Sequence, residues 1–335
     1  MKYLDNPVLG IETSCDETSV AVVRGRNVLA NVVSSQAELH RQWGGVVPEA
    51  AARKHTEALI PALDTALKIS GCALHDMGGV GVTNRPGLVG ALSVGVSAAK
   101  AVSLALAKPM VGIHHLEAHI LSSLMAADVE FPHVCLLVSG GHTELVFVKS
   151  AGGYVKVGGT IDDAAGEAFD KSARALGLGY PGGPAIQSAA ESGDEKKYKL
   201  PAGLRGPTLD FSFSGLKTAV LYLARDEDES LDVASAAASM EETVVAVLVE
   251  RTLRACEETG AKAITVVGGV AANKRLRAKL KLLATERSLD FVTPPFDLCT
   301  DNAAMIAHVA SWRLAKGEAD DLRMDTLASA ALPGG

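Results

Sequence analysis

The sequence predicts an α/β protein of two lobes, each built around a mixed β-sheet and both made on one duplicated plan. The chain of 335 residues is long enough to form two hydrophobic cores. Apolar residues make up 48% and charged residues 21%, which is a globular composition. Two segments, residues 8–23 (VLGIETSCDETSVAVV) and residues 134–148 (VCLLVSGGHTELVFV), share the pattern of strand, polar turn and strand. Because each opens a run of strands and helices, we expect two similar halves with a cleft between them.

The first half is predicted from apolar periodicity and from the residues that break it. In chain order we expect strands within residues 8–33, a helix at 48–69, a strand at 79–83, a helix at 88–107, a strand at 107–113 and a helix at 114–127. The segment 88–107 is near the length of a bilayer span. Lys100, three serines and the lack of an aromatic belt favour instead a buried core helix rich in glycine and alanine.

The second half follows the same order. We expect the hairpin at 134–148, a strand at 154–160, a helix at 164–176, a rigid turn at 177–184, a helical region at 231–259, a strand at 263–267, a basic helix from Asn273, a strand at 290–293 and a helix at 301–316. The charged residues 191–212, interrupted by proline and glycine, predict a long surface excursion. We expect residues 1–112 with 300–335 to form one lobe and residues 113–299 the other.

Composition narrows the class of function. The net charge of −7 argues against a broad basic face, so nucleic acid would bind locally or together with a partner. The five cysteines are scattered without a CxxC pair, which fits a reducing cytoplasm and excludes a zinc ribbon. The N-terminus lacks the pattern of a signal peptide, and we expect no membrane association.

Glycine-containing turns predict contact with phosphate. In the turn Ser139-Gly140-Gly141, glycine permits positive φ and close approach of the backbone to a ligand. A single turn of this kind is more often only a hairpin. Gly268-Gly269 follows an apolar strand and could lie against a nucleotide, although a packing role is the commoner explanation. Asn273 then opens a helix, as a cap or as a ligand contact.

His115 and His119 are the strongest metal-ligand candidates. They stand at i and i+4, on one face of a predicted helix. A third ligand is needed, and Asp301 could supply it unless it only caps the last helix. Two histidines and a carboxylate suit iron(II) or zinc. Glu117 lies about 200° round the helix from His115, so the zinc-protease motif HExxH is a poor match.

Several charged residues have both a functional and a structural explanation. Glu12 points away from Ile11 if the first strand persists, so it could face the cleft and handle a proton. Glu167 and Asp170 are neighbours on one helix face, where solvation beside Lys171 is the simpler explanation. The basic run at residues 274–281 is the densest on the chain; such runs are more often solvated faces than nucleic-acid contacts.

Taken together, these segments closely resemble the TsaD family of tRNA N6-adenosine threonylcarbamoyltransferases, formerly labelled glycoproteases. The resemblance runs in order through nine motifs from residue 8 to beyond residue 305: residues 8–23, 34–49, HHLEAH at 114–119, 136–145, IDDAAGEAFDK at 161–171, 176–184, LDFSFSGLKT at 209–218, 266–277 and CTDNAAMIA at 299–307. It implies the two-lobed fold of actin, sugar kinases and chaperone ATPases around a nucleotide cleft. It also implies transfer of the threonylcarbamoyl group of threonylcarbamoyl-adenylate to N6 of the adenosine beside the anticodon, in tRNAs reading codons that begin with A, with release of AMP.

The resemblance also assigns residues and partners. Its metal ligands fall on His115, His119 and Asp301, and the family is described with one iron(II) per subunit, with Zn²⁺ or Mg²⁺ as alternatives. Substrate contacts fall on Leu137, Val138, Ser139, Gly140, Gly141, Asp170, Gly183 and Asn273, with Glu12 as our candidate catalytic residue. The implied partners are tRNA, a TsaB-like inactive paralogue, a TsaE-like ATPase and a separate synthase that supplies the adenylate. A small-molecule kinase of the same fold and, less well supported, a metalloprotease are the rival functions.

Two positions depart from the family pattern. Arg85 stands where the family usually has glycine before Pro86-Gly87-Leu88, which removes φ freedom and adds a charge at the start of a helix. Gln187 stands where some members carry aspartate.

Overall fold

The computed structural model describes residues 1–41, 46–227 and 230–334, and the described chain divides into two compact units. Unit 1 comprises Met1–Ala127 with Thr300–Pro333, and unit 2 comprises Asp128–Cys299 with Gly334. The lobe boundary expected at 112/113 and the unit boundary at 127/128 differ by one helix, which packs in unit 1. Residues 42–45 of the second family motif lie outside the described residues.

Unit 1 is a five-stranded mixed sheet in the order β3-β2-β1-β4-β5. Its strands are β1 (Val8–Glu12), β2 (Glu17–Arg24), β3 (Asn27–Ser35), β4 (Gly79–Arg85) and β5 (Met110–His114). Its helices are α1 (Ala37–Arg41), α2 (Pro48–Ser70), α3 (Val89–Leu106), α4 (His115–Ala126) and α10 (Ala303–Ala315). β1 pairs antiparallel with β2 and parallel with β4. The short helix α1 had no signal in the sequence analysis.

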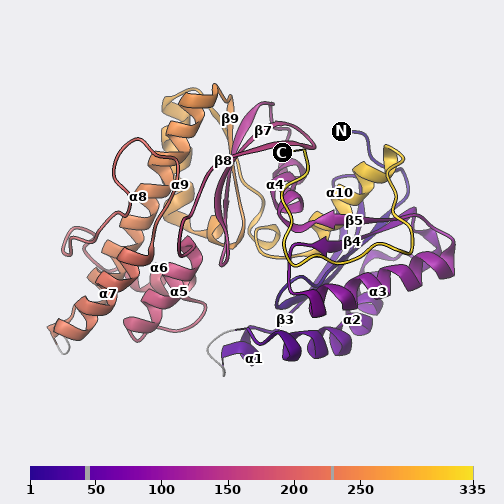
Figure 1. Ribbon diagram of the computed structural model, residues 1–335, viewed down its shortest axis with the longest axis horizontal. Helices are drawn as coiled ribbons and strands as arrows, with labels where there is room; N and C mark the ends of the chain where they lie inside the picture. Colours follow the sequence, from indigo (N-terminus) through magenta and orange to yellow (C-terminus); the bar gives the residue numbers. More distant parts are fainter. Residues whose placement is uncertain (42–45, 228–229, 335) are drawn as a thin grey trace. The chain divides into compact units, whose positions relative to one another are not determined.

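Helix α10 lies flat on the sheet of unit 1, on the face opposite α3 (Figure 1). Alternation along β1 sends Gly10 and Glu12 to the α10 face and Ile11 to the α3 face. A Cβ on Gly10 would lie 2.3 Å from the carbonyl oxygen of Ala303, and one on Gly81 would lie 2.3 Å from Cβ of Ala310. The two glycines therefore allow the close approach that brings the start of α10 to the ends of the strands.

Helix α3 is only partly the core helix that the sequence predicts. Its buried residues Ala91, Leu92, Gly95, Val96 and Ala99 form one face toward β4, while Val89 and Leu104 are exposed. The helix is long and apolar enough to cross a membrane by length and composition, which core helices of soluble proteins also satisfy. The expectation of a buried core helix therefore holds for one face only, because the described part of the chain covers only one side of the helix.

Unit 2 repeats the strand plan of unit 1, in the order β10-β9-β6-β7-β8. Its strands are β6 (His133–Val138), β7 (Thr143–Ser150), β8 (Gly153–Gly159), β9 (Ala263–Val267) and β10 (Asp290–Val292). Its helices are α5 (Ala165–Ala175), α6 (Gly182–Ala190), α7 (Ser214–Glu227), α8 (Val233–Thr259) and α9 (Lys274–Glu286). β6 pairs antiparallel with β7 and parallel with β9, as β1 does with β2 and β4. The duplicated mixed-sheet plan is confirmed.

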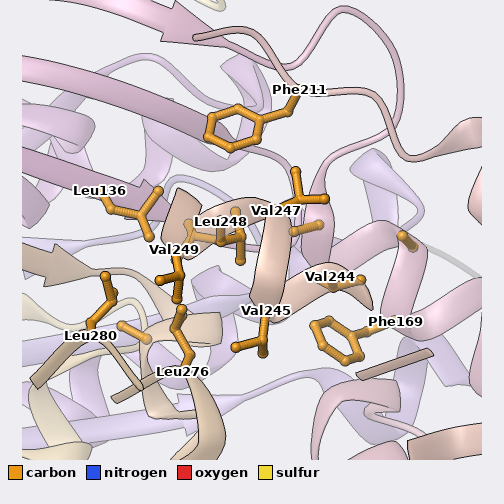
Figure 2. Close-up of a cluster of buried hydrophobic side chains, with 14 of the residues drawn as sticks. Leu136, Phe169, Phe211, Val244, Val245, Val247, Leu248, Val249, Leu276 and Leu280 are labelled. Atoms are coloured by element: carbon orange, nitrogen blue, oxygen red, sulfur yellow. The ribbon is translucent and has the colours of Figure 1, made fainter. Parts of the chain in front are cut away.

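The core of unit 2 is built around α8, which runs through its centre. Figure 2 shows Val244, Val245 and Leu248 of α8 gathered with Leu136 of β6 and Phe169 of α5. These side chains are almost wholly buried. Burial of this kind supplies most of the stabilising free energy of the unit.

Two helices of unit 2 were missed. Residues 182–184, expected in a rigid turn, form the first turn of α6, and residues 214–227 form α7. Asp162 accepts hydrogen bonds from the backbone N–H groups of Phe213 and Ser214 and from the hydroxyl of Ser214. The cap of α7 thus lies about fifty residues upstream, where local pattern reading cannot find it. The expected surface excursion at 191–212 contains no helix or strand, as predicted, and Arg251 of α8 anchors it by donating to the carbonyls of Leu204 and Thr208.

Candidate functional site

His115, His119 and Asp301 come together in unit 1. The ligand atoms of the three side chains all lie within 4.8 Å of one another. Both histidines belong to α4, which begins directly after β5, and their rings meet edge to face with centroids 4.7 Å apart. Nε2 of His119 lies 2.9 Å and Nε2 of His115 lies 3.5 Å from Oδ1 of Asp301. The third ligand therefore approaches the same side of the helix as the other two.

Asp301 is free to act as a ligand because its neighbour caps the helix. The side chain of Asn302 accepts a hydrogen bond from the backbone N–H of Met305 and is the N-cap of α10. The alternative that Asp301 is only the cap of the last helix is therefore wrong. The flat packing of α10 on Gly10 and Gly81 holds Asp301 at the carboxyl end of the sheet, beside α4.

Glu12 fixes the orientation of His115. Oε2 of Glu12 lies 3.0 Å from Nδ1 of His115 and accepts a 2.5 Å hydrogen bond from the hydroxyl of Thr83. Oε1 accepts from the backbone N–H of Ser14, whose hydroxyl also lies 3.2 Å from Nδ1 of His115. In a neutral His115 whose proton lies on Nδ1 toward this carboxylate, the lone pair of Nε2 is directed toward Asp301 and is available to a metal.

The local charges favour a cation between these groups. Burial raises the pKa of Asp301, but the charges and hydrogen bonds of His115 and His119 outweigh it and hold the pKa well below its ordinary value. Burial lowers the pKa of His115, but Asp301 and Glu12 together raise it well above its ordinary value. Burial also raises the pKa of Glu12, and the nearby His115 overcomes that effect and lowers it. Positive charge is therefore stabilised where the three ligand atoms meet.

The donor set fits a transition metal. Two imidazole nitrogens and one carboxylate oxygen match the preferences of iron(II) and zinc, whereas magnesium prefers oxygen ligands. Glu117 takes no part in this set. It is fully buried and accepts a 2.6 Å hydrogen bond from Arg313, on another side of α4. The arrangement therefore lacks the metal-adjacent general base of the HExxH proteases.

The glycine-paired turn of unit 2 is held by its own hydrogen bonds. The backbone N–H of Ser139 donates to the carbonyl of His142, and the hydroxyl of Ser139 accepts from the N–H of His142. Neither Gly140 nor Gly141 has a positive φ, so the turn does not use that freedom of glycine. A Cβ on either glycine would meet nothing within 4 Å. Packing within the chain thus does not explain the two glycines, whereas close approach of a ligand to the backbone would.

Other candidate residues gather at the same end of the sheet of unit 2. Leu137 and Val138 are buried in β6. Gly268, with φ of +94°, passes so close to β6 that a Cβ would lie 2.4 Å from the carbonyl oxygen of Val138. Asp170 accepts a 2.7 Å hydrogen bond from the N–H of Gly182 at the start of α6, and Gly183 beside it has open space where a side chain would be. Asn273 follows Gly268 by five residues and caps α9.

The acidic pair of α5 splits into two roles. Glu167 forms an ion pair with Lys171 and its side chain is 42% exposed, which agrees with the solvated-face explanation. Asp170 turns instead to the start of α6.

Three cations in the basic run of α9, Arg275, Arg277 and Lys279, have partners within unit 2. Arg275 pairs with Glu241 and Glu242, and Lys279 pairs with Glu242. Arg277 donates to the carbonyls of Ala271 and Pro294. Because these three cations already have partners, they are poor candidates for contact with nucleic acid.

The two departures from the family pattern are both accommodated. Arg85 is half-buried and donates a 2.6 Å hydrogen bond to Oδ1 of Asn84. Burial lowers the pKa of its guanidinium, and so does the neighbouring charge of Arg313, while Glu117 acts in the opposite direction. Gln187 accepts a 2.8 Å hydrogen bond from the N–H of Lys274, at the first turn of α9.

Some participants were not anticipated. Ser14 and Thr83 both contact the group formed by Glu12 and His115, and Glu241 contacts Asn273. Thr83 has a weak signal, since it ends a strand and follows Gly81 by two residues on the same face. Glu241 has none, because it stands in the middle of a long helix.

Solved structures with similar folds confirm the fold class. Component A of the (R)-2-hydroxyglutaryl-CoA dehydratase of Acidaminococcus fermentans aligns with a TM-score of 0.55 and 14% identity, over 92% of this chain and 99% of that one. Full-length HypF in its phosphate- and nucleotide-bound form aligns with a TM-score of 0.61 and 13% identity, over 98% of this chain and 48% of that one. At these identities the likeness concerns the fold alone.

Curated relatives and a family model are far more similar to this chain in sequence. The model described as "TsaD: tRNA N6-adenosine threonylcarbamoyltransferase" matches residues 27–308. The tRNA N6-adenosine threonylcarbamoyltransferase of Synechocystis sp. is 50% identical over 327 residues, covering 95% of this chain and 94% of the relative. That of Syntrophotalea carbinolica is 49% identical over 323 residues, with the same coverage. The chain therefore belongs to the TsaD family.

Proposed function

We propose that this protein is a tRNA N6-adenosine threonylcarbamoyltransferase. The observation that carries the proposal is the near full-length identity of about half its residues to relatives of that name. In the reaction, N6 of the adenosine beside the anticodon forms a bond to the carbamoyl carbon of threonylcarbamoyl-adenylate. The bond from that carbon to the phosphate oxygen breaks, AMP leaves with the electron pair, and N6 loses a proton. The acceptor tRNAs would be those reading codons that begin with A.

His115, His119 and Asp301 would hold one divalent metal, with iron(II) as our first candidate and zinc as the second. When bound, such a metal supplies a Lewis acid that polarises an oxygen of the reacting group. Glu12 keeps the proton of His115 on Nδ1, so that Nε2 points toward Asp301. Glu12 is fully buried, and its carboxylate is already in contact with the N–H of Ser14, the hydroxyl of Thr83 and Nδ1 of His115, which leaves it poorly placed to take the N6 proton. We propose instead that Glu12 is a positioning residue.

In unit 2, the adenylate would bind at the turn Leu137–Gly141, with Asp170, Gly183 and Asn273 as further contacts. The open space where side chains would stand at Gly140, Gly141 and Gly183 supports this assignment, because a ligand can approach the backbone there. The N6 amine is a weak nucleophile, so orientation and charge stabilisation would carry most of the rate enhancement.

The proposal extends to partners and place of action. A TsaB-like paralogue and a TsaE-like ATPase would assist the reaction, and a separate synthase would supply the adenylate. The five cysteines form no disulfide, which agrees with action in the reducing cytoplasm.

Reconstitution tests the proposed function. The purified chain, candidate partners, threonylcarbamoyl-adenylate and unmodified tRNA are combined, and the nucleosides of the product are analysed. We expect the modified adenosine to form with the unsubstituted chain and to be lost with His115→Ala, whereas His75→Ala should retain activity because that side chain is 80% exposed. Failure of every partner combination to yield the modified nucleoside would refute the function. ATP consumption in the absence of tRNA and partners would favour the kinase alternative.

A further inference from the structure

Asn273 of unit 2 is held by two opposite hydrogen bonds. Its Oδ1 accepts from the backbone N–H of Leu276, and its Nδ2 donates to Oε1 of Glu241 at 2.7 Å. If the amide were turned over, Nδ2 would face the N–H of Leu276 and Oδ1 would face the carboxylate of Glu241. Both contacts would then be repulsive, so the two partners together fix one orientation of the amide.

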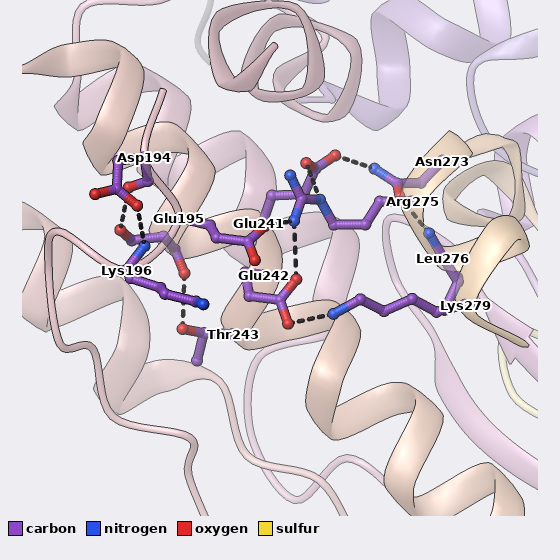
Figure 3. Close-up of polar contacts among 11 residues, drawn as sticks. Asp194, Glu195, Lys196, Glu241, Glu242, Thr243, Asn273, Arg275, Leu276 and Lys279 are labelled. Atoms are coloured by element: carbon purple, nitrogen blue, oxygen red, sulfur yellow. Dashed lines mark hydrogen bonds and ion pairs between the residues drawn. The ribbon is translucent and has the colours of Figure 1, made fainter. Parts of the chain in front are cut away.

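Glu241 is itself firmly fixed. It stands in the middle of α8, it is 2% exposed, and its Oε2 accepts a 2.9 Å hydrogen bond from Nε of Arg275. Figure 3 shows the carboxylate of Glu241 between Asn273 on one side and Arg275 on the other. A buried carboxylate with two fixed donors cannot turn away without leaving one of them unpaired.

Glu242, the next residue of α8, forms ion pairs as Glu241 does, but it is not a partner of the Asn273 amide. It contacts Arg275 and Lys279, and Figure 3 shows no contact from it to Asn273. Glu195 also pairs with Arg275. The charge of Arg275 is therefore balanced by three carboxylates, whereas among the described residues the Asn273 amide contacts the carboxylate of Glu241.

We propose that Glu241 is a positioning residue for binding of the adenylate, acting through Asn273. The two fixed bonds leave one N–H and one lone pair of the Asn273 amide for a ligand, each in a fixed direction. Pre-orientation of these two groups lowers the ordering cost of binding. The inference rests on the proposed function, since it takes the adenylate as the ligand of Asn273.

Glu241→Gln is the test, with Glu242→Gln as the matched control. Glutamine preserves the shape of the side chain, but it has one acceptor oxygen where glutamate has two. Its NH₂ group therefore faces the donor of either Asn273 or Arg275, and one of the two hydrogen bonds is lost. We expect KM for threonylcarbamoyl-adenylate to rise about tenfold, as for loss of one hydrogen bond to a charged group, with kcat within about twofold. AMP binding measured by calorimetry should weaken by the same factor. Glu242→Gln should change neither quantity.

A double-mutant cycle separates positioning from general damage. In an Asn273→Ala background, Glu241→Gln should weaken AMP binding no further, since the residue through which it acts is gone. An equal effect in both backgrounds, or unchanged KM and AMP affinity in Glu241→Gln, would overturn the inference. If Glu241→Gln does not fold, Glu241→Asp, which shortens the reach to Asn273, is measured in its place with the same expectations. Absence of modified adenosine with the unsubstituted chain would refute the proposed function instead, and the calorimetric cycle would still test the link between Glu241 and Asn273.

Discussion

Replacement of Glu12 by glutamine separates two roles of this residue. As a positioning residue, Glu12 acts on His115 and hence on metal affinity; as a proton acceptor, it would act on turnover alone. In the unsubstituted chain, Oε2 faces Nδ1 of His115 at 3.0 Å and the hydroxyl of Thr83 at 2.5 Å. In Glu12→Gln, Oε1 can still accept from the N–H of Ser14, which then directs the amide NH₂ toward Nδ1 of His115.

That exchange reverses the hydrogen-bonding role of Nδ1 of His115, which must then accept a hydrogen bond where it donated one before. Facing an N–H donor, the neutral ring is favoured with its proton on Nε2, where it blocks the lone pair that points toward Asp301. Loss of a carboxylate that orients a ligating histidine typically lowers metal affinity about 10- to 100-fold, equivalent to roughly 1.4–2.7 kcal/mol. The hydroxyl of Ser14, 3.2 Å from Nδ1, offers a partial substitute, so we expect the lower half of that range.

The assay is titration of the metal-free protein with iron(II) under anaerobic conditions, and with zinc in competition with a chelator. Glu117→Gln is the control, since Glu117 is also a buried carboxylate on the helix that bears the histidines but pairs with Arg313. It should lower the melting temperature without changing metal affinity. Unchanged metal affinity in Glu12→Gln together with a collapse of kcat would refute our reasoning and establish Glu12 as the proton acceptor.

Two further predictions concern unit 1. Gly10→Ala places a Cβ 2.3 Å from the carbonyl oxygen of Ala303, so α10 must shift. We expect the free energy of unfolding by urea to fall by about 1–3 kcal/mol, and metal binding to weaken because Asp301 moves with α10. Unchanged values of both quantities would contradict the packing argument. Burial lowers the pKa of His308 to about 4, although its hydrogen bond to the carbonyl of Gly25 acts in the opposite direction. Below pH 6.5, His308 is therefore protonated more readily in the unfolded chain than in the folded chain. The free energy of unfolding should therefore fall by about 3 kcal/mol as the pH drops from 6.5 to 4. Measured by urea unfolding at several pH values, it should depend less on pH in His308→Leu than in the unsubstituted chain. The same pH dependence in both proteins would be evidence against this assignment.

Much of the fold could be predicted from local pattern. The bounds of α2, α5, α8 and β9 agree with expectation within about two residues, because their apolar periodicity and their glycine or proline boundaries are local signals. Helix α7 was missed because its cap is Asp162, far along the chain. The exposed side of α3 was missed because composition shows how apolar a helix is, and only packing shows how much of it is covered.

The candidate sites divide in the same way. The pair His115 and His119 could be predicted from helical spacing, since residues four apart share a face. Asp301 and Asn302 could not be told apart as ligand and cap, because both are good capping residues and only one of them fits the helix start. The basic run of α9 looked like a charged surface because its acidic partners, Glu195, Glu241 and Glu242, lie in other segments.

The sequence by itself determined the two duplicated units, the order of the strands and of most helices within each, the histidine pair and the family. These follow from short-range periodicity and from motifs, which are properties of neighbouring residues. The family resemblance names Asp301 as the third ligand, and the tertiary structure shows that it meets the histidines. Tertiary structure alone decided that Glu12 contacts Nδ1 of His115 and that Glu241 fixes the amide of Asn273. Each of these contacts joins residues on different helices or strands. Hydrogen bonds form only when donor and acceptor lie about 3 Å apart, and close packing of helices on sheets brings such residues within that distance.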